Sequence, residues 1–369
     1  MKHSLLLCLT FAAIIVNSCK TEIQNNLETI FCNTEHADST MGQYIENVSV
    51  LVLETGDNVI RNADKISFLN EKIYIGDFRS RRIFVFDMTG KLDFIVDRSG
   101  RGPQEYLEIK TFTVDDSNIY ILDNYRKAIN LYNSTTGEFV RKMRCPIVAW
   151  DMEVLHNKGF IFAFAPMEHG KLNEKQKCFR LHVTDSALNT THSYYPLQSD
   201  EYDILGFKRY FSVTDSSIVY SSFLANGITL LNKTDGHIEK EIDIHFPVPV
   251  PEKKKREREI LTGNYNYLLD TPIICNDYMM LDVNEGDFCE NYMYIRKERK
   301  CVKNREAEST EGYISNPSAS YDNAFVSVIA AEHEYLELTK CGLLEYNPEV
   351  HDSINNDKPV LVFYHMRTW

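Results

Sequence analysis

The sequence lacks any apolar run of the roughly 20 residues that a helix needs to cross a bilayer. Its longest apolar stretch covers only residues 5–16, follows a short basic start and ends just before Ser18 and Cys19. A basic start, a short apolar core and a small residue before the cleavage point are typical of a signal peptide. We therefore expect residues 1–18 to be removed on export.

Residues 16–19, Val-Asn-Ser-Cys, resemble a bacterial lipobox, in which the cysteine is acylated and becomes the new N-terminus. Acyl chains hold a protein on a membrane by about 0.8 kcal/mol per buried CH₂ group. The sequence therefore predicts lipid attachment at Cys19, a tether over residues 19–45, and an outer-membrane lipoprotein on either face of that membrane. The alternative is an ordinary secretory signal followed by a coincidental cysteine.

Basic side chains are in deficit, since 40 Lys and Arg stand against 53 Asp and Glu, for a formal net charge of −13. Sustained binding to phosphates needs clustered Lys and Arg, so we exclude nucleic acid as a partner. The partners left are the membrane, through the lipid anchor, and a glycan or an envelope protein.

The sequence also lacks the short motifs of common active sites. There is no Cys-x-x-Cys, no His-Glu-x-x-His, no Gly-x-Ser-x-Gly and no phosphate-binding glycine loop. We therefore predict no metal and no cofactor, and the catalytic residues, if any, are unknown. A carboxylate pair for sugar hydrolysis stays open, because any pairing among the 53 acidic residues depends on the fold.

Seven cysteines remain after the loss of Cys8 and the acylation of Cys19. An odd number cannot pair completely, and their irregular spacing is not that of a compact disulfide framework. We expect one or two bridges, with most of the others buried as small apolar residues. The seven are Cys32, Cys145, Cys178, Cys275, Cys289, Cys301 and Cys341.

Long helical periodicity is nearly absent, and short alternating apolar stretches rich in Tyr and Phe recur between turns, which is typical of all-β folds. Residues 73–77 align with residues 119–123, and 83–86 with 129–132, so the offset is 46 residues in both cases. A repeat of this length is that of a four-stranded propeller blade.

The fold class predicted is all-β, a six-bladed β-propeller of four-stranded antiparallel blades over residues 46–369. No Pro-, Gly- or Ser-rich linker divides this region. Strands from both chain ends are expected to close the ring, which removes an exposed sheet edge.

Residues 247–270 are expected to form an insertion, which is either a solvated charged segment or a ligand-contacting lid. Residues 331–340 are expected to form a helix. The six blades are placed at residues 66–96, 110–143, 149–196, 211–243 and 272–305, with the sixth combining 324–329, 359–365 and 48–53.

Residues 100–106, Gly-Arg-Gly-Pro-Gln-Glu-Tyr, resemble the loop between the first two blades in six-bladed β-propeller lipoproteins of Gram-negative gut bacteria. Residues 356–364 resemble the closing strand of the same family, with Lys358 where asparagine is usual, and residues 77–87 resemble an NHL-type repeat. The resemblance implies the fold and the envelope location. It implies little about activity, because most members are uncharacterised.

Within that loop, Arg101, Glu105 and Tyr106 are the candidate ligand-binding residues. The alternative is a purely structural connector, in which Gly100 and Gly102 adopt unusual backbone angles and Arg101 bonds to Glu105. Asp77 and Asp123 recur in successive blades, so we expect both to cap turns rather than to catalyse.

The sequence thus favours a non-enzymatic binding or scaffold module, whose ligand is a glycan, a peptide or a partner protein. Trp150, Tyr194 and Tyr195 are aromatic side chains that would suit stacking on sugar rings. An envelope hydrolase or lyase acting on polysaccharide or peptide at the propeller channel is the alternative. Charged residues from three or more blades meeting in one pocket with shifted pKa values would favour it.

Overall fold

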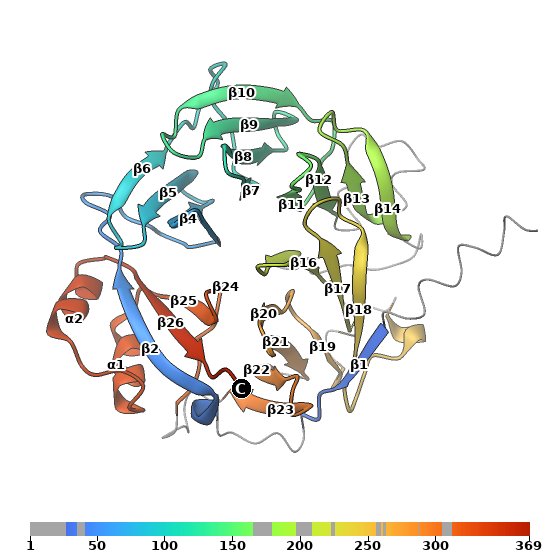
Figure 1. The fold of residues 1–369 in the computed structure, drawn as a ribbon, viewed down its shortest axis with the longest axis vertical. Helices are drawn as coiled ribbons and strands as arrows, with labels where there is room; N and C mark the ends of the chain where they lie inside the picture. The colour runs from blue at the N-terminus through green and yellow to red at the C-terminus, as the bar shows by residue number, and fades with distance from the viewer. Residues whose placement is uncertain are drawn as a thin grey trace, which may run out of the picture.

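The 46-residue repeat of the sequence becomes two neighbouring blades in a ring of six small sheets, and Figure 1 shows this ring down its axis. The all-β, six-bladed propeller is therefore confirmed. The computed structural model describes residues 27–34, 41–164, 179–196, 209–222, 226–255, 260, 263–286, 288–304 and 312–369. The expected signal peptide, Cys19 and Cys178 lie outside these residues.

Each blade is an antiparallel meander that runs from the channel outward. Blade 1 holds β3 (Lys65–Leu69), β4 (Lys72–Asp77), β5 (Arg82–Asp87) and β6 (Leu92–Val96). Blade 2 holds β7 (Thr111–Val114), β8 (Asn118–Asp123), β9 (Ala128–Asn133) and β10 (Phe139–Arg144). Blade 3 holds β11 (Asp151–Val154), β12 (Phe160–Ala163), β13 (Phe179–Thr184) and β14 (Thr190–Pro196).

The second half of the ring is less regular. Blade 4 holds β15 (Phe211–Val213), β16 (Ser217–Tyr220), β17 (Gly227–Asn232) and β18 (Ile238–His245). Blade 5 holds β19 (Asn266–Leu268), β20 (Ile273–Cys275), β21 (Tyr278–Glu285), β22 (Phe288–Ile295) and β23 (Lys300–Asn304). Blade 6 holds β24 (Ala319–Tyr321), β25 (Ala324–Ile329), β26 (Val360–Met366) and β2 (Ile45–Val52).

Both chain ends close blade 6, as the sequence predicts. The early strand β2 pairs antiparallel with the late strand β26, with Val48 opposite Tyr364 and Val52 opposite Val360. Because the two strands come from opposite ends of the chain, the ring is held shut by a full ladder of backbone hydrogen bonds.

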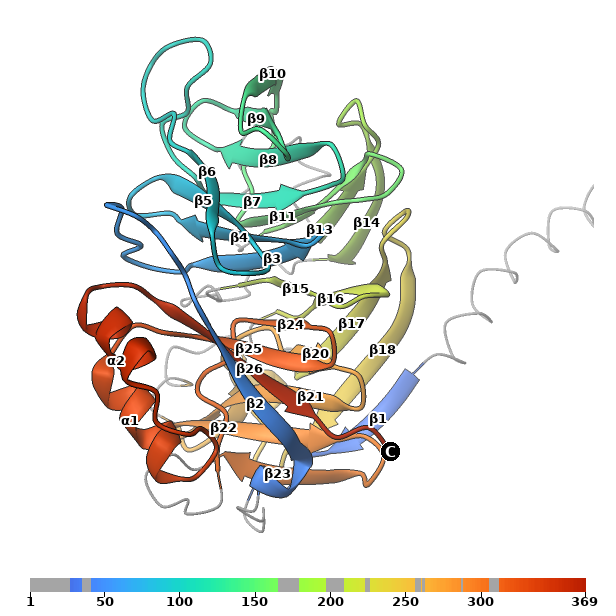
Figure 2. The ribbon, with the colours of Figure 1, turned by 60° about the vertical axis from the view of Figure 1, so that its left-hand side comes forward.

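A strand that the sequence analysis did not predict reinforces the other side of the ring. β1 (Leu27–Phe31) adds a fifth strand to blade 4 by pairing in parallel with β18 (Figures 1 and 2). The 3-10 helix η2 (Met41–Tyr44) also packs into the core, through Met41 and Tyr44. The described parts of residues 27–45 therefore belong to the propeller, and the expected tether is shorter than residues 19–45.

The clasp, by which we mean β1 together with Cys32, ties blade 4 to blade 5. Cys32 forms a disulfide with Cys301 on β23, across 269 residues of sequence. The Glu28 carboxylate lies 2.6 Å from Lys240 Nζ on β18 and 3.6 Å from Arg296 Nε in the turn before β23. One bridge was within the expected number, and among the other described cysteines Cys145 and Cys275 are buried.

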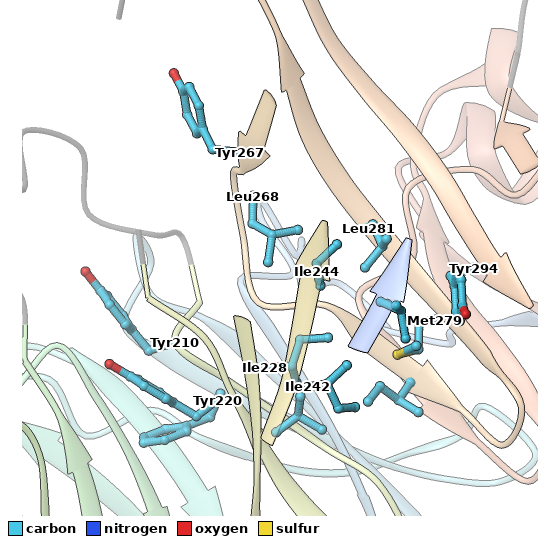
Figure 3. Packing of buried hydrophobic residues seen from close by; sticks show 14 of the residues in the cluster. Tyr210, Tyr220, Ile228, Ile242, Ile244, Tyr267, Leu268, Met279, Leu281 and Tyr294 are labelled. Atoms are coloured by element: carbon cyan, nitrogen blue, oxygen red, sulfur yellow. The ribbon is translucent and has the colours of Figure 1, made fainter. Parts of the chain in front are cut away.

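The core lies between the blades rather than inside one sheet. Each blade has neighbours on both faces, so its middle strands are buried on both faces, as in the run of five buried residues in β4. Figure 3 shows part of the layer between blades 4 and 5, where Ile242 and Ile244 on β18 lie toward Leu268 and Leu281 of blade 5. Burial of this kind is the main favourable contribution to folding.

Asp77 and Asp123 hold their blades together at equivalent positions, as the repeat predicts. Asp77 accepts hydrogen bonds from the amide of Ser80, three residues on, and from that of Arg61, sixteen residues back. Asp123 accepts from amides at the same two offsets, those of Arg126 and Leu107. Each carboxylate therefore joins a turn of its own blade to the segment that enters the blade.

Replacing Asp77 with Asn should lower the free energy of unfolding at pH 7 by about 1–3 kcal/mol, because an amide NH₂ would face a backbone N–H. Burial alone would raise the pKa of Asp77, but hydrogen bonds from Ser80, Arg61 and Asn62 hold it below the usual 3.8. This stabilisation is present above pH 3.8 and is lost as the pH falls through the folded-state value. Urea unfolding at pH 7 and pH 3 should show a gap between wild type and variant that narrows in acid. Exposed Asp57→Asn is the control, and a gap of equal size at both pH values would contradict the assignment.

Two helices connect β25 to β26 on the outside of blade 6 (Figure 2). The first, α1 (Glu332–Lys340), confirms the predicted helix. The second, α2 (Pro348–Asn355), was not predicted, although Asn347 as N-cap followed by proline is a recognisable start signal. Neither of these two helices of the described chain is long and apolar enough to cross a membrane.

The expected insertion at residues 247–270 contains a short 3-10 helix, η4 (Glu252–Lys254). Its later part is not an insertion, because β19 pairs with β21 and belongs to blade 5. Val250 and Ile260 are buried in the core of blades 4 and 5, so the described parts of this segment pack against the propeller.

Candidate functional site: the axial channel

The innermost strands of the blades surround a cavity of about 550 Å³ on the propeller axis. Five of the six inner strands line it, namely β3, β7, β11, β15 and β24. This volume lies within the usual range of small-molecule sites, roughly 300–1,000 Å³. The channel is therefore the natural candidate for a binding site.

Blades 1 to 3 give the channel a charged and polar wall. Lys65 starts β3, Thr111 starts β7 and Asp151 starts β11, so the repeat brings the three side chains to one level. The Lys65 ammonium lies 3.4 Å from Asp151 Oδ1, and the Thr111 hydroxyl donates to the same oxygen at 2.8 Å. Three blades are thus joined by one polar cluster.

A second polar level lies two residues further along the same strands. Glu153 Oε1 lies 2.5 Å from the Lys65 ammonium, and the Thr113 hydroxyl donates to Glu153 Oε2 at 2.6 Å. We refer to Lys65, Asp151 and Glu153 as the ionic triad. Their side chains are only 11%, 7% and 8% exposed, so all three charges are largely removed from water.

Asp151 is saturated with hydrogen-bond donors, whereas Glu153 accepts from two. Besides Lys65 and Thr111, Asp151 accepts from the amides of Tyr210 and Phe211 through Oδ2, which fixes the start of blade 4. Burial disfavours the ammonium form of Lys65, but Asp151 and Glu153 more than offset this and raise its pKa above the usual 10.5. Lys65 is therefore protonated at physiological pH and is unsuited to act as a general base.

The side of the channel formed by blades 6 and 1 is aromatic. The rings of Phe68 on β3 and Tyr321 on β24 stack with centroids 4.5 Å apart and an angle of 23° between their planes. Both rings are partly exposed and line the cavity. The Tyr321 hydroxyl has no hydrogen-bond partner within the described chain, and neither has the hydroxyl of Ser67, which also lines the cavity.

We call the end of the channel where the inner strands finish the exit mouth. Here Lys158 lies 2.7 Å from Asp115, and Asn70 donates to Asp116. Burial raises the pKa of Asp115, but hydrogen bonds from Lys158, neighbouring amides and Tyr120 bring it below its usual value. The negative charge of Asp115 is therefore balanced by the positive charge of Lys158.

Lys233 also lines the channel near the exit mouth. Its ammonium donates to the backbone oxygens of Thr214 and Asp215, at 2.9 and 3.4 Å, and forms no ion pair with any described side chain. Burial lowers the pKa of Lys233, and nearby Glu153 and Asp215 offset this only in part.

At the opposite end, where the inner strands begin, Arg209 lines the channel. Its guanidinium lies 3.1 Å from Asp270 and donates to the backbone oxygens of Ser318 and Thr271. Arg209 therefore links the starts of blades 4, 5 and 6.

Most contacts of the loop around residues 100–106 hold the loop itself in place. Tyr106 is fully buried, and its hydroxyl donates to the oxygens of Arg81 and Val96. Arg101 is exposed and forms no ion pair with Glu105, which instead accepts from the Gly102 amide at 2.5 Å. The expected bond between Arg101 and Glu105 is thus wrong, because the backbone donor is nearer. Arg101 keeps its place as a candidate for ligand contact.

The two glycines of this loop serve a different purpose from the expected one. Neither Gly100 nor Gly102 has a positive φ. Instead, the Glu105 carboxylate occupies the space where a Cβ at Gly100 would lie. Arg126 then donates to the oxygens of Gly102 and Gly100 and fastens the loop to blade 2.

The aromatic residues singled out from the sequence lie away from the channel lining. Tyr195 bonds to Thr229 and Glu241 in the layer between blades 3 and 4. The face of Trp150 is covered by the Lys110 ammonium, 3.4 Å from the ring centroid. Phe68 and Tyr321 were not predicted as site residues, because nothing in either local sequence separates a channel aromatic from a core one.

Charged side chains from several blades do meet in one cavity, yet no described group of three His, Cys, Asp or Glu side chains is placed to hold a metal ion. In the alignment of blade 1 with blade 2, Lys65 stands where blade 2 has Thr111. The only trace of the triad in the sequence is this replacement of a hydroxyl residue by a lysine at an equivalent position.

Comparison with known proteins finds a family, similar folds and no curated relative. A candidate exported protein of Bacteroides fragilis is 15% identical, covers 93% of this chain and 100% of its own, and has a TM-score of 0.73. A DUF4221 member from Bacteroides vulgatus is 8% identical, covers 88% and 98%, and has a TM-score of 0.48. At these identities the likeness concerns the fold alone. The profile of a domain of unknown function, DUF4934, matches residues 26–365, and since this is most of the chain, the protein belongs to the DUF4934 family.

Proposed function

We propose that this protein is an exported binding module, held at the cell envelope through an acylated Cys19, which takes up its ligand in the axial channel. The observation that carries the proposal is the cavity of about 550 Å³, lined by five blades and opening among polar and aromatic side chains. Sites of this size with apolar walls and a few oriented polar groups are typical of ligand binding.

Export is supported by three independent features. The first 18 residues have the pattern of a signal peptide, and the Cys32–Cys301 disulfide is of a kind that persists outside the reducing cytoplasm. The Bacteroides fragilis protein of similar fold is itself described as a candidate exported protein. Anchoring is supported by the lipobox-like residues 16–19.

A hydrolase or lyase is the weaker alternative. It would need a carboxyl or imidazole group that exchanges protons with a substrate. Asp151 and Glu153 are committed to Lys65, to threonine hydroxyls and to backbone amides, which is the arrangement of a structural ion cluster. We therefore favour binding without turnover.

Filling the channel tests the binding site. Ser67→Trp places a large ring in the cavity, whereas Thr135→Trp adds the same bulk on an exposed turn of blade 2. A screen of oligosaccharides and peptides against the mature chain should identify ligands whose binding is lost in Ser67→Trp and kept in Thr135→Trp. If every ligand found binds both variants equally, the channel is not the site.

Replacing Cys19 with Ala tests the anchor. The wild-type protein should incorporate labelled palmitate and sediment with membranes, and the variant should do neither, because two or three acyl chains provide essentially all of the membrane affinity. Circular dichroism of both proteins should be the same, since Cys19 lies before the first strand of the propeller. Membrane sedimentation of the unlabelled variant would show that another contact anchors the protein.

A further inference from the structure

We propose that the ligand of the axial channel is a neutral oligosaccharide. This inference rests on the proposed function and narrows it to one class of ligand. It draws on three observations: the two chemically different walls of the channel, its charge balance, and the hydroxyl groups that it leaves unpaired.

The aromatic wall fits the apolar face of a sugar ring. Phe68 and Tyr321 form one stacked pair between blades 1 and 6, and both rings are partly exposed to the cavity. Pyranose rings present a face of C–H groups, and aromatic rings with a negative face attract such groups. The partly exposed surface of this pair is therefore an apolar patch on one side of the channel that the C–H groups of a sugar ring can contact.

The polar wall fits the hydroxyl edge of the same ring. Ser67 stands next to Phe68 in sequence, and its hydroxyl has no partner within the described residues. At the exit mouth, Asn70 and Asp116 bond to each other and still have free donor and acceptor capacity. The Tyr321 hydroxyl adds a further group. A polyhydroxylated ligand would satisfy these groups without introducing a charge.

The charge balance argues against an anionic ligand. The cavity is lined by five carboxylates and four basic side chains, so its formal charge is −1 when His156 is counted as neutral. Lys65, Lys158 and Arg209 are each paired with a carboxylate. Lys233 donates only to two backbone oxygens. In addition, the net charge of −13 repels polyanions from the molecule as a whole. A uronic acid or sulfated chain would find one unpaired cation here.

The closing experiment compares three classes of probe on the mature chain by saturation-transfer NMR and calorimetry. These are neutral oligosaccharides of glucose, mannose, galactose, xylose and N-acetylglucosamine, charged oligogalacturonate and heparin fragments, and neutral tripeptides. We expect binding by at least one neutral oligosaccharide, and an affinity about tenfold weaker in Tyr321→Leu, which keeps apolar bulk but removes the ring. Tyr321→Phe should keep most of the affinity. Tyr346→Ala, an exposed aromatic after α1, is the matched control and should bind like wild type.

The possible failures are distinguishable. If only charged oligosaccharides or peptides bind, and Ser67→Trp abolishes their binding, the channel is a binding site and the assignment to neutral sugars is wrong. If neutral sugars bind but Tyr321→Leu and Phe68→Leu have no effect, the channel assignment of the sugar is wrong. If no probe of any class binds the folded protein, both the inference and the proposed function fail.

Discussion

Replacing Lys65 with Met should lower the free energy of unfolding by about 3–5 kcal/mol, the largest effect that we expect from a single substitution. The side chains are similar in length, so the loss would come from charge rather than packing. Without the ammonium group, Asp151 and Glu153 would be two like charges in a site where their side chains are only 7% and 8% exposed. The midpoint of thermal unfolding should fall by about 4–7 °C.

The pair of Lys158 and Asp115 at the exit mouth provides the control. The Lys158 side chain is 53% exposed, and Asp115, which is 12% exposed, keeps hydrogen bonds from the Tyr120 hydroxyl and two backbone amides without it. Lys158→Met should therefore cost clearly less stability than Lys65→Met. Adding Glu153→Gln to Lys65→Met should recover part of the loss, because one buried charge is removed. Equal destabilisation by Lys65→Met and Lys158→Met would contradict the role of the triad.

The pH dependence of the Lys65 contribution has a definite sign. The folded-state pKa of Lys65 is raised above 10.5, so the stabilisation is fully present below pH 10.5 and is lost as the pH rises through the folded-state value. The difference between wild type and Lys65→Met should therefore be constant from neutral pH to about pH 10 and should narrow above it.

Removing the clasp disulfide should have an effect of similar size. In the chain-entropy description, a crosslink across 269 residues stabilises the folded state by about 5 kcal/mol. The double variant Cys32→Ser/Cys301→Ser should therefore unfold at a temperature about 5–10 °C below that of wild type. Scanning calorimetry with and without a reductant checks this, because the reductant should destabilise wild type and leave the double variant unchanged.

Cys289 supplies a matched control, because it is a free and exposed cysteine on β22. Cys289→Ser should unfold at the wild-type temperature and should keep the response to reductant. A thiol count should confirm that the reductant has opened the disulfide completely. If the unfolding temperature of the reduced wild-type protein is then unchanged, the clasp does not stabilise the fold.

The fold could be predicted because a propeller repeats one unit. The alignment of residues 73–77 with 119–123 gave the blade length, and the same residues carry Asp77 and Asp123, whose caps are repeated in the structure. Closure by both chain ends followed from the need to cover a sheet edge. β1 was missed since five residues that pair with a strand more than 200 positions away leave no local pattern.

The site was largely unpredictable for the opposite reason, because binding residues differ from blade to blade. Lys65, Thr111 and Asp151 hold equivalent positions but differ in chemistry, so the repeat marks them only by a change of residue type. The conspicuous loop at residues 100–106 proved to connect blades 1 and 2, with Tyr106 buried and Glu105 bonded to the backbone. Phe68 and Tyr321 meet only when blades 1 and 6 become neighbours.

The position of the clasp also limits how far the protein can move from the bilayer. Under the proposed acylation of Cys19, only residues 20–26 separate the lipid from β1, which starts at Leu27. From Cys19 to Leu27 a fully extended chain reaches at most about 29 Å. Because β1 is fixed to blades 4 and 5 by strand pairing and by the disulfide, this side of the ring would stay next to the lipid headgroups.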